Sequence, residues 1–550
     1  MSAALITTVA LPWTVYTPEL FLLGAALLIF LLDSLGLRRL EVLGGIATAG
    51  IIAALIGVLA DLGFAPLAGL STVSPSQVNV PWADLGRSLV SVTSFGLVFQ
   101  AIFLTSALLV ALASCSRPSH ERGAAIFFGL LLFATLGMTL AALAADLIFL
   151  LLAIEVTGIS TYLLVGYTRR DPRGLEASMK FYIIGALSAA LSFFGASLLY
   201  AVYGTTSLAA LGAEMFYSVH PPLMGATSIA LLGYGFLIVG IGFKVTAVPF
   251  QAWAVDVYDG APSEVSAFLA GGSKKLGFLA YFLVFLVPIL WISHNFVIPP
   301  VPCPAATCFA LVPRFGVPLQ LIFGVMAVVT MTIGNVLALQ QTELKRMLAY
   351  SSISQAGYML IGLSVATAPA LAGALLQIFA HVFMKAGAFL VVAAVATFGV
   401  GSRVEDWKGV GLRYPFLGAS FAVMLLSLAG IPLTVGFVSK FVLFSAAVQA
   451  QGWFVWLAVA GLLNSALSVF YYARVLRVMY MDRPLAETVP IPEGAVVGGA
   501  DPPRLPLGGV GYGRAIAIGI AVLAIFAFGV YPQPVLASFQ MAVNNLLRIL

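Results

Sequence analysis

Six charged residues of this sequence lie well inside apolar stretches, and their side chains have the chemistry to carry protons. They are one carboxylate, Glu155, and five lysines, Lys244, Lys274, Lys275, Lys385 and Lys440. A charge within a membrane is costly and usually serves a function. Burial favours the neutral form of an amine, whereas a nearby carboxylate favours the charged form. A lysine beside a glutamate can therefore switch between two protonation states, which predicts a proton path.

Some of these lysines have a second interpretation besides a role in proton transfer. A lysine near a helix end can extend its stem so that the ammonium reaches the membrane surface. Glu155 and Lys244 lie too far from any loop for this, but both interpretations stay open for Lys275 and Lys385. His381 and Lys385 are four residues apart, on one helical face, which suits a proton relay. The sequence contains no CxxC motif and no phosphate-binding glycine loop, so we expect no metal or cofactor in this chain.

Prolines accompany two of the lysines. Pro249 follows Lys244 in GFKVTAVPFQAW, and Pro432 precedes Lys440 in LAGIPLTVGFVSKF. A proline in mid-helix breaks the helix, and the backbone groups that it frees must bind water or side chains. We therefore expect a polar, hydrated strip beside each lysine.

The elements that position these residues are membrane-spanning helices. Hydrophobic residues make up 61% of the 550 residues and charged residues 9%, whereas soluble domains carry roughly a quarter charged residues. Uncharged stretches of about 20 residues recur along the chain and predict an all-α integral membrane protein with about fourteen helices. The two broken helices, the seventh and the twelfth, predict inverted five-helix repeats over residues 125–290 and 320–480. Residues 1–124 would then form helices 1–3, and residues 481–550 a cytoplasmic loop and the last helix.

The loops predict the orientation. Alternate loops hold eighteen Lys and Arg residues on one side, Arg514 among them, and three on the other, Arg87, Arg314 and Arg548. Cytoplasmic loops are the ones rich in Lys and Arg, so both termini should lie outside. The net charge of +5 then reflects topology and gives no reason to expect nucleic acid. Cys303 and Cys308 fall in an outer loop, where a disulfide and two free thiols are both possible.

Four long motifs carry a resemblance to a known family. They are LEASMKFYIIGA (175–186), GFKVTAVPFQAWAVDVYDGAPSEVSAFLAGGSK (242–274), GNVLALQQTELKRMLAYSSISQAGY (334–358) and LAGIPLTVGFVSKF (428–441). Together they resemble the N subunit of bacterial respiratory complex I. The same family includes subunit 2 of the NAD(P)H or ferredoxin:quinone complexes of cyanobacteria and plastids. The similarity covers nearly the whole chain.

The resemblance implies an antiporter-like fold and a role for each matching residue. Glu155 matches the carboxylate of the fifth helix, Lys244 its partner at the seventh, Lys274 the central lysine of the eighth and Lys440 the terminal lysine of the twelfth. It implies a proton-translocating membrane subunit of an NADH:quinone oxidoreductase. NAD(P)H or ferredoxin, FMN, iron–sulfur clusters and quinone would be bound by other subunits. Its partners would be sister antiporter-like subunits, small membrane subunits and lipid, in a bacterial inner membrane or a thylakoid.

The sequence departs from the family pattern in three places. Gln251 and Gln355 stand where many members have histidine, and glutamine cannot carry a proton. His381 with Lys385 is more similar to the L-type and cation/proton antiporter sisters. A subunit of a Na⁺/H⁺ antiporter is therefore the alternative function. Only about ten residues are expected after the last apolar run, too few for the lateral helix of the L-type subunit.

Overall fold

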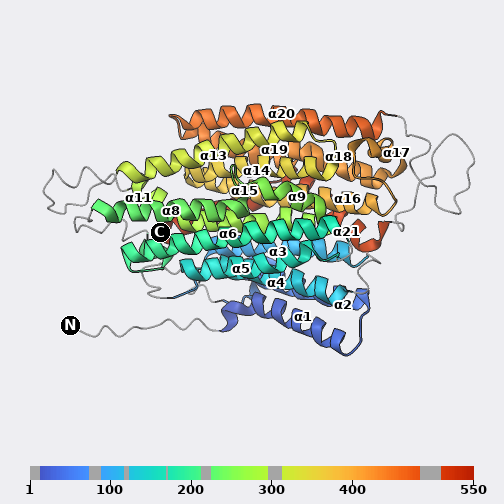
Figure 1. The fold of residues 1–550 in the computed structure, drawn as a ribbon, viewed down its shortest axis with the longest axis horizontal. Coiled ribbons are helices and arrows are strands. Elements are labelled where there is room, and N and C mark those ends of the chain that lie inside the picture. Colours follow the sequence, from blue (N-terminus) through green and yellow to red (C-terminus); the bar gives the residue numbers. More distant parts are fainter. Residues whose placement is uncertain are drawn as a thin grey trace, which may run out of the picture.

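The computed structural model describes residues 13–73, 78, 88–116, 123–168, 171–211, 224–294, 313–482 and 510–549. Within these residues the chain is helical apart from turns and four isolated bridges. The long helices run side by side, with α1 along one edge of the bundle and α20 along the opposite edge (Figure 1). The expectation of an all-α membrane protein is confirmed.

The first half of the described chain forms the helices that carry Glu155, Lys244, Lys274 and Lys275. They are η1 Trp13–Tyr16, α1 Thr17–Ser34, α2 Leu40–Asp61, η2 Ala65–Leu70, α3 Ser94–Ser114, α4 Ala124–Ala142, α5 Leu147–Val165, α6 Pro172–Tyr203, α8 Met224–Val245, α9 Ala252–Gly260, α10 Ser263–Phe268, the π-helical η5 Leu269–Ser273, and α11 Lys274–His294.

The second half carries His381, Lys385 and Lys440. Its helices are α13 Pro313–Leu339, α14 Leu344–Val365, α15 Ala368–His381, the π-helical η6 Val382–Ala386, α16 Gly387–Ala396, η7 Val404–Trp407, α17 Val410–Arg413, α18 Pro415–Ala429, α19 Val435–Gln449, α20 Phe454–Tyr480, α21 Tyr512–Val530 and α22 Gln533–Ile549.

The number of membrane-spanning helices is close to the number expected from the sequence. Twelve helices among the described residues are long and apolar enough to cross a membrane. The 22-residue α14 is as long as most of them but is more polar, and α18 with α19 forms a span broken in the middle. By length and composition alone the described residues give twelve spans, or thirteen if the bent pair Val404–Arg413 and Pro415–Ala429 counts as one. Counting α14 and the broken pair of α18 and α19 instead would give the expected fourteen. The division of the chain into two inverted repeats with flanking parts stays a prediction.

Both expected helix breaks are present. The first separates α8 from α9 around Pro249, and the second separates α18 from α19 around Pro432. In each break a residue other than glycine adopts a positive φ: Thr246 at 61° and Leu433 at 70°. Such a conformation costs of order 1–3 kcal/mol and persists only where the surrounding structure imposes it. The breaks are therefore defined features of the fold.

The eighth and eleventh spans form the centre of the bundle. The membrane-crossing windows within Ser263–Leu286 and Ala368–Ala396 are 100% and 94% buried. Each span contains a five-residue π-helical segment, η5 or η6, and these two segments pack against each other. π-Helical turns are rare and are frequent at functional sites. The helical periodicity of the sequence gave no sign of them.

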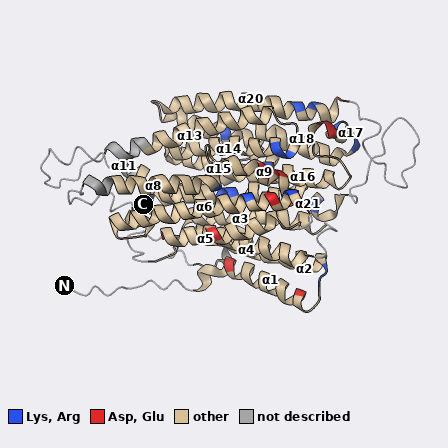
Figure 2. Cartoon of the chain, viewed as in Figure 1, with Lys and Arg blue, Asp and Glu red and all other residues tan. Residues whose placement is uncertain are grey.

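Charged residues are distributed unevenly along the bundle (Figure 2). Few lie along the helices, and many of them gather at the end that contains α17 and the start of α21. This distribution matches the excess of Lys and Arg that the sequence places on one side. The assignment of that end to the cytoplasm stays a prediction.

The expectation that only about ten residues follow the last apolar run is wrong. A 17-residue helix, α22, follows the last span and packs on α3 and α15. Tyr531 and Pro532 separate it from α21, so the apolar run is shorter than the sequence suggested. One face of α22 is buried through Phe539, Val543 and Leu546, while Met541 is exposed. α22 is thus an amphipathic helix outside the fourteen spans.

Candidate proton path

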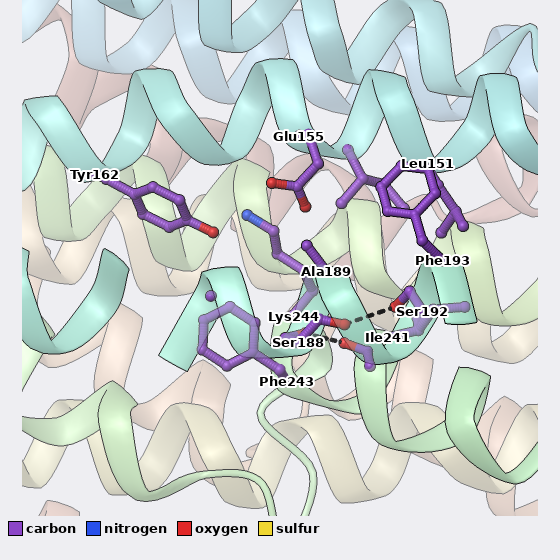
Figure 3. A pocket seen from close by; sticks show the side chains of 13 residues that line it. Leu151, Glu155, Tyr162, Ser188, Ala189, Ser192, Phe193, Ile241, Phe243 and Lys244 are labelled. Atoms are coloured by element: carbon purple, nitrogen blue, oxygen red, sulfur yellow. Dashed lines mark hydrogen bonds between the residues drawn. The ribbon is translucent and has the colours of Figure 1, made fainter. Parts of the chain in front are cut away.

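Glu155 and Lys244 face each other in a pocket between α5, α6 and α8 (Figure 3). Lys244 lies in the last turn of α8 and is 4% exposed. Its Nζ lies 5.5 Å from the centroid of the Tyr162 ring and 5.7 Å from that of Phe181, within the range of a cation–π contact. Among the described residues Nζ has no hydrogen-bond partner. The nearby carboxylate and the two rings are therefore the groups that stabilise a positive charge here.

The first helix break fixes the position of Lys244. Trp253, after the break, donates a hydrogen bond from Nε1 to the carbonyl of Phe243, before it, at 3.1 Å. The same indole stacks on Phe181 with centroids 4.4 Å apart. The amide of Val248 in the break donates to Thr330 Oγ1 of α13 at 3.0 Å. Contacts on both sides of the break therefore hold the end of α8 in place.

Lys274 links the eighth span to α14. It follows the π-helical segment η5 and is 2% exposed. Its Nζ donates to the carbonyl of Ser352 at 2.8 Å and to the Oγ of the same residue at 3.1 Å. The lysine from the first half of the chain is thus bound by a helix of the second half.

Lys385 binds the neighbouring serine of α14. This lysine lies within η6, is fully buried and donates from Nζ to Ser351 Oγ at 2.6 Å. Ser351 Oγ also shares a hydrogen bond with the hydroxyl of Tyr472 on α20. Adjacent serines therefore hold lysines from two different spans.

Lys275 and His381 are in direct contact. Both are fully buried, and Lys275 Nζ lies 2.7 Å from His381 Nδ1. Of the two interpretations left open for Lys275 and Lys385, the structure therefore supports burial, because neither ammonium reaches the membrane surface. His381 and Lys385, expected on one helical face, lie on either side of the junction between α15 and η6.

Lys440 lies beside the second helix break and uses the carbonyls that the break exposes. Its Nζ donates to the carbonyls of Leu428 at 2.8 Å and Ala429 at 3.2 Å, and to Ser465 Oγ at 2.9 Å. Three acceptors match the three donors of an ammonium group. The Tyr358 ring centroid lies 4.8 Å from the same Nζ. The three acceptors can therefore bind Lys440 while it is protonated.

A row of neutral side chains leads from the eleventh span to the Lys440 site. Ser439 Oγ donates to Gln377 Oε1 at 2.5 Å, and Gln377 Nε2 donates to Gln355 Oε1 at 2.7 Å. Gln355 Nε2 in turn donates to the carbonyl of Leu428 at 3.2 Å. Gln355 is thus a member of the row, whereas Gln251 Oε1, after the first break, has no hydrogen-bond partner in the described part of the chain.

The structure therefore brings the candidate residues into three groups. Glu155 and Lys244 form the first; Lys274, Lys275, Lys385 and His381 form the second; and Lys440 forms the third. No direct side-chain hydrogen bond joins the first group to the second among the described residues. Sequence reasoning missed Ser351, Ser352 and Ser465, which bind three of these lysines, and it missed Gln377, which binds Gln355. Their only signal was a polar residue type within an apolar run.

One of the basic residues expected in the cytoplasmic loops is buried within the described structure. Arg514, expected in the cytoplasmic loop, lies in the first turn of α21, and its Nη2 forms an ion pair with Glu264 Oε1 of α10 at 3.2 Å. Both side chains are at most 3% exposed. Cys303 and Cys308 lie outside the described residues.

Comparison with known proteins decides the family. Residues 144–301 and 304–468 match the model of the family described as NADH:quinone oxidoreductase/Mrp antiporter, transmembrane. The chain belongs to this family. The two matched segments together contain Glu155, Lys244, Lys274, Lys275, Lys385, His381 and Lys440.

Curated relatives in this family are similar over most of their length. The chain is 37% identical to F(420)H(2) dehydrogenase subunit N of Methanosarcina mazei, over 94% of this chain and 95% of the relative. It is 34% identical to NADH-quinone oxidoreductase subunit N of an Anaeromyxobacter species, over 96% of each. It also resembles NAD(P)H-quinone oxidoreductase subunit 2 of Prochlorococcus marinus, at 35% identity over 80% of this chain and 81% of the relative.

Two solved structures have a fold similar to that of this chain. A chain of respiratory complex I from Thermus thermophilus superimposes with a TM-score of 0.69 at 26% identity, over 94% of this chain and 98% of that chain. A chain of the Mrp complex from a Dietzia species superimposes with a TM-score of 0.77 at 20% identity, over 98% of each. At this low identity the second match establishes the fold alone.

Proposed function

We propose that this chain is the N-type membrane-arm subunit of a quinone oxidoreductase related to complex I, and that it translocates protons. The observation that carries the proposal is the set of buried lysines along a line of broken and π-helical spans, with Glu155 facing Lys244 and hydrogen-bond partners at the other lysines. A purely structural role would leave these charged groups in the bilayer without a purpose. Curated relatives that match nearly the whole chain are N subunits of such oxidoreductases, which supports the same conclusion.

In this proposal each site performs one part of the transfer. Glu155 stabilises the protonated form of Lys244, and movement of that carboxylate away from the amine releases the proton. Lys274 and Lys385 receive it at the centre of the bundle, where serine hydroxyls bind both amines. Lys440 holds it on the carbonyls of the second break, and a change in that break releases it to the far side. The breaks provide the backbone groups that orient water along the way.

The electron-transfer chemistry belongs to partner subunits. The similar curated proteins are named for different electron donors, F420H2, NADH and NAD(P)H, although their N-type chains are alike. In our proposal NAD(P)H, ferredoxin or reduced F420, and FMN, iron–sulfur clusters and quinone, are bound by those partners. The partners are sister antiporter-like and small membrane subunits, within the lipid of a bacterial inner membrane or a thylakoid. Both termini of this chain then lie on the outer or lumenal side.

The proposal is tested by Lys244→Ala and Glu155→Ala in the intact complex. Reconstituted in liposomes, both variants should still reduce quinone, but more slowly, and proton uptake should slow with it because the two processes are coupled. Lys408→Ala, in a connecting segment after the eleventh span, is the matched control and should behave as the parent protein. Unchanged proton uptake in both variants would remove Glu155 and Lys244 from the path.

The antiporter alternative is separated by omitting the electron donor. A Na⁺/H⁺ antiporter subunit should exchange sodium for protons across the membrane without any donor, whereas the oxidoreductase should then be silent. Mass spectrometry of the proteins that co-purify with a tagged copy gives a second answer. Iron–sulfur and quinone-site subunits among them support the oxidoreductase, and antiporter subunits alone support the alternative.

A further inference from the structure

A carboxyl group outside the proposed proton path is buried near the beginning of α1. Glu19, in the first turn of that helix, is 4% exposed, and Gln100 of α3 is 1% exposed. Gln100 Nε2 donates to Glu19 Oε1 at 2.8 Å and to the carbonyl of Thr139 on α4 at 3.2 Å. Three helices therefore meet at this point, and the proposed function gives it no role.

The atoms at this point include more hydrogen-bond acceptors than donors. Glu19 Oε2 and Gln100 Oε1 are buried, and neither has a hydrogen-bond partner among the described residues. The amide group of Gln100 has two hydrogens to donate, and its bonds to Glu19 and Thr139 use both of them. The Thr139 hydroxyl donates to the carbonyl of Leu136 at 3.0 Å. One further donor is needed here, because an unpaired buried acceptor is costly.

The groups around Glu19 supply no positive charge. Within the described part of the chain Glu19 forms no ion pair. The helices α3 and α4 carry no charged residue, and α2, which packs on α1, ends at Asp61, a second carboxylate whose charge acts on Glu19. Tyr16 of η1 is the other titratable group beside it, and it has no cationic form. An ionised Glu19 would therefore be a buried charge without a partner, close to a charge of the same sign.

We propose that Glu19 is a proton-binding site, a carboxylic acid that pairs with the amide of Gln100 and joins α1 to α3. A proton on Oε2 supplies the missing donor and removes the charge at the same time. Acid and amide then exchange two hydrogen bonds. The bond from Gln100 Nε2 to Glu19 Oε1 is present in the structure, and the bond from Glu19 Oε2–H to Gln100 Oε1 pairs the two remaining acceptors. The inference does not depend on the proposed function.

The site makes the packing of α1 sensitive to pH. This helix lies at one edge of the bundle (Figure 1) and packs on α2 and α4, while side chains such as Leu27 and Leu31 are exposed. When α1 moves away from the bundle, Oε2 meets water, gives its proton to water and becomes a carboxylate, the ordinary form of a glutamate at neutral pH. The packed state thus binds one proton more than the loosened state. Its stability is complete at acidic pH and falls as the pH rises.

Hydrogen–deuterium exchange of peptides from α1, measured over a series of pH values in the protein purified with its partner subunits, tests the proposal. Glu19→Gln keeps the shape of the acid, is neutral at every pH, and its amide can donate to Gln100 Oε1. Parent and variant should exchange alike at acidic pH. As the pH rises, α1 of the parent should exchange faster than α1 of the variant, by up to about tenfold for each pH unit. Comparison at equal pH removes the effect of pH on the exchange reaction itself.

Three results would overturn the proposal. Parallel pH profiles of parent and variant would show that the packed state binds no extra proton at Glu19. Faster exchange in Glu19→Gln than in the parent at every pH, or failure of this variant to assemble, would show that the carboxylate is needed in its charged form. A change in the exchange of the parent when sodium chloride is replaced by choline chloride would identify a metal cation as the ligand in place of the proton.

Two further variants complete the experiment. Gln100→Leu removes the amide and leaves the acid without its partner, so α1 should exchange faster than in the parent even at acidic pH; an unchanged rate would contradict the pairing. Glu41→Gln makes the same change from carboxyl to amide at an exposed position in the first turn of α2, and its pH profile should follow that of the parent. Proton uptake does not enter these measurements, so this proposal and the proposed function can fail separately.

Discussion

Replacement of Lys440 by methionine should stop proton translocation and leave the complex assembled. The substitution removes three hydrogen bonds from the ammonium group, each contributing about 1.5–3 kcal/mol net. It also relieves the cost of burying an ion, which is several kcal/mol. No acceptor is left unpaired, because Gln355 Nε2 still binds the Leu428 carbonyl and Ser465 Oγ still binds that of Ala429.

These opposing contributions are of similar size. The free energy of unfolding should therefore change by no more than about 2 kcal/mol in either direction, which is modest among core substitutions. The proton, by contrast, loses its binding site beside the break and must cross this region without one. A barrier higher by only about 1.4 kcal/mol slows the transfer tenfold. We therefore expect proton uptake to fall at least about tenfold.

The assay compares assembly with transport in the same membranes. The abundance of the complex on a native gel reports assembly, and a pH-sensitive dye inside liposomes reports proton uptake during quinone reduction. Lys440→Arg retains the bonds to the carbonyls but stays protonated, so it should assemble and fail to pump. Proton uptake at the parent rate in Lys440→Arg would refute the reasoning, because Lys440 would then not need to release a proton.

Two further predictions concern the packing that holds the path. Glu264→Gln should lower the free energy of unfolding by about 3–5 kcal/mol, because it removes the negative charge from the buried ion pair with Arg514. The double variant Glu264→Gln/Arg514→Met should recover part of this loss in thermal unfolding of the purified complex. Gly436→Ala should destabilise the second break by about 1–3 kcal/mol, because the added methyl group would collide with the carbonyl of Ser427 and lie 2.8 Å from Met384 Sδ. Gly45→Ala, where an added methyl group meets nothing within 4 Å, is its control and should melt at the parent temperature.

The sequence predicted those features that have a local signal. Glu155 and Lys244 interrupt apolar runs, and Pro249 and Pro432 interrupt helices, so the charged residues and both breaks could be recognised from neighbouring residues alone. The contact between Lys275 and His381 could not, because 106 residues separate them and only the packing of two spans brings them together. For the same reason the sequence left open whether the Lys275 ammonium reaches the membrane surface.

Expectation and structure differ where a local signal was ambiguous. Arg514 was assigned to a loop because it begins an apolar run, and the buried carboxylate that pairs with it is 250 residues away. The apolar residues of α22 were read as the end of the last span, although a helix with one buried face has a similar composition. The π-helical segments change the helix by a single residue per turn, which the pattern of hydrophobic residues does not reveal.

The complete burial of the eighth span also determines how the chain must enter the membrane. On insertion scales a lysine at the centre of a helix costs about 2.5–3.5 kcal/mol, so Lys274 and Lys275 together cost about 5–7 kcal/mol. The residues that bind these lysines, Ser352 and His381, are synthesised about 80 and 110 residues later. The eighth span is therefore stabilised in the bilayer only when α14 and α15 have been made. Apolar substitutions at either lysine should ease insertion, so a normal amount of protein in the membrane is no sign that the proton path works.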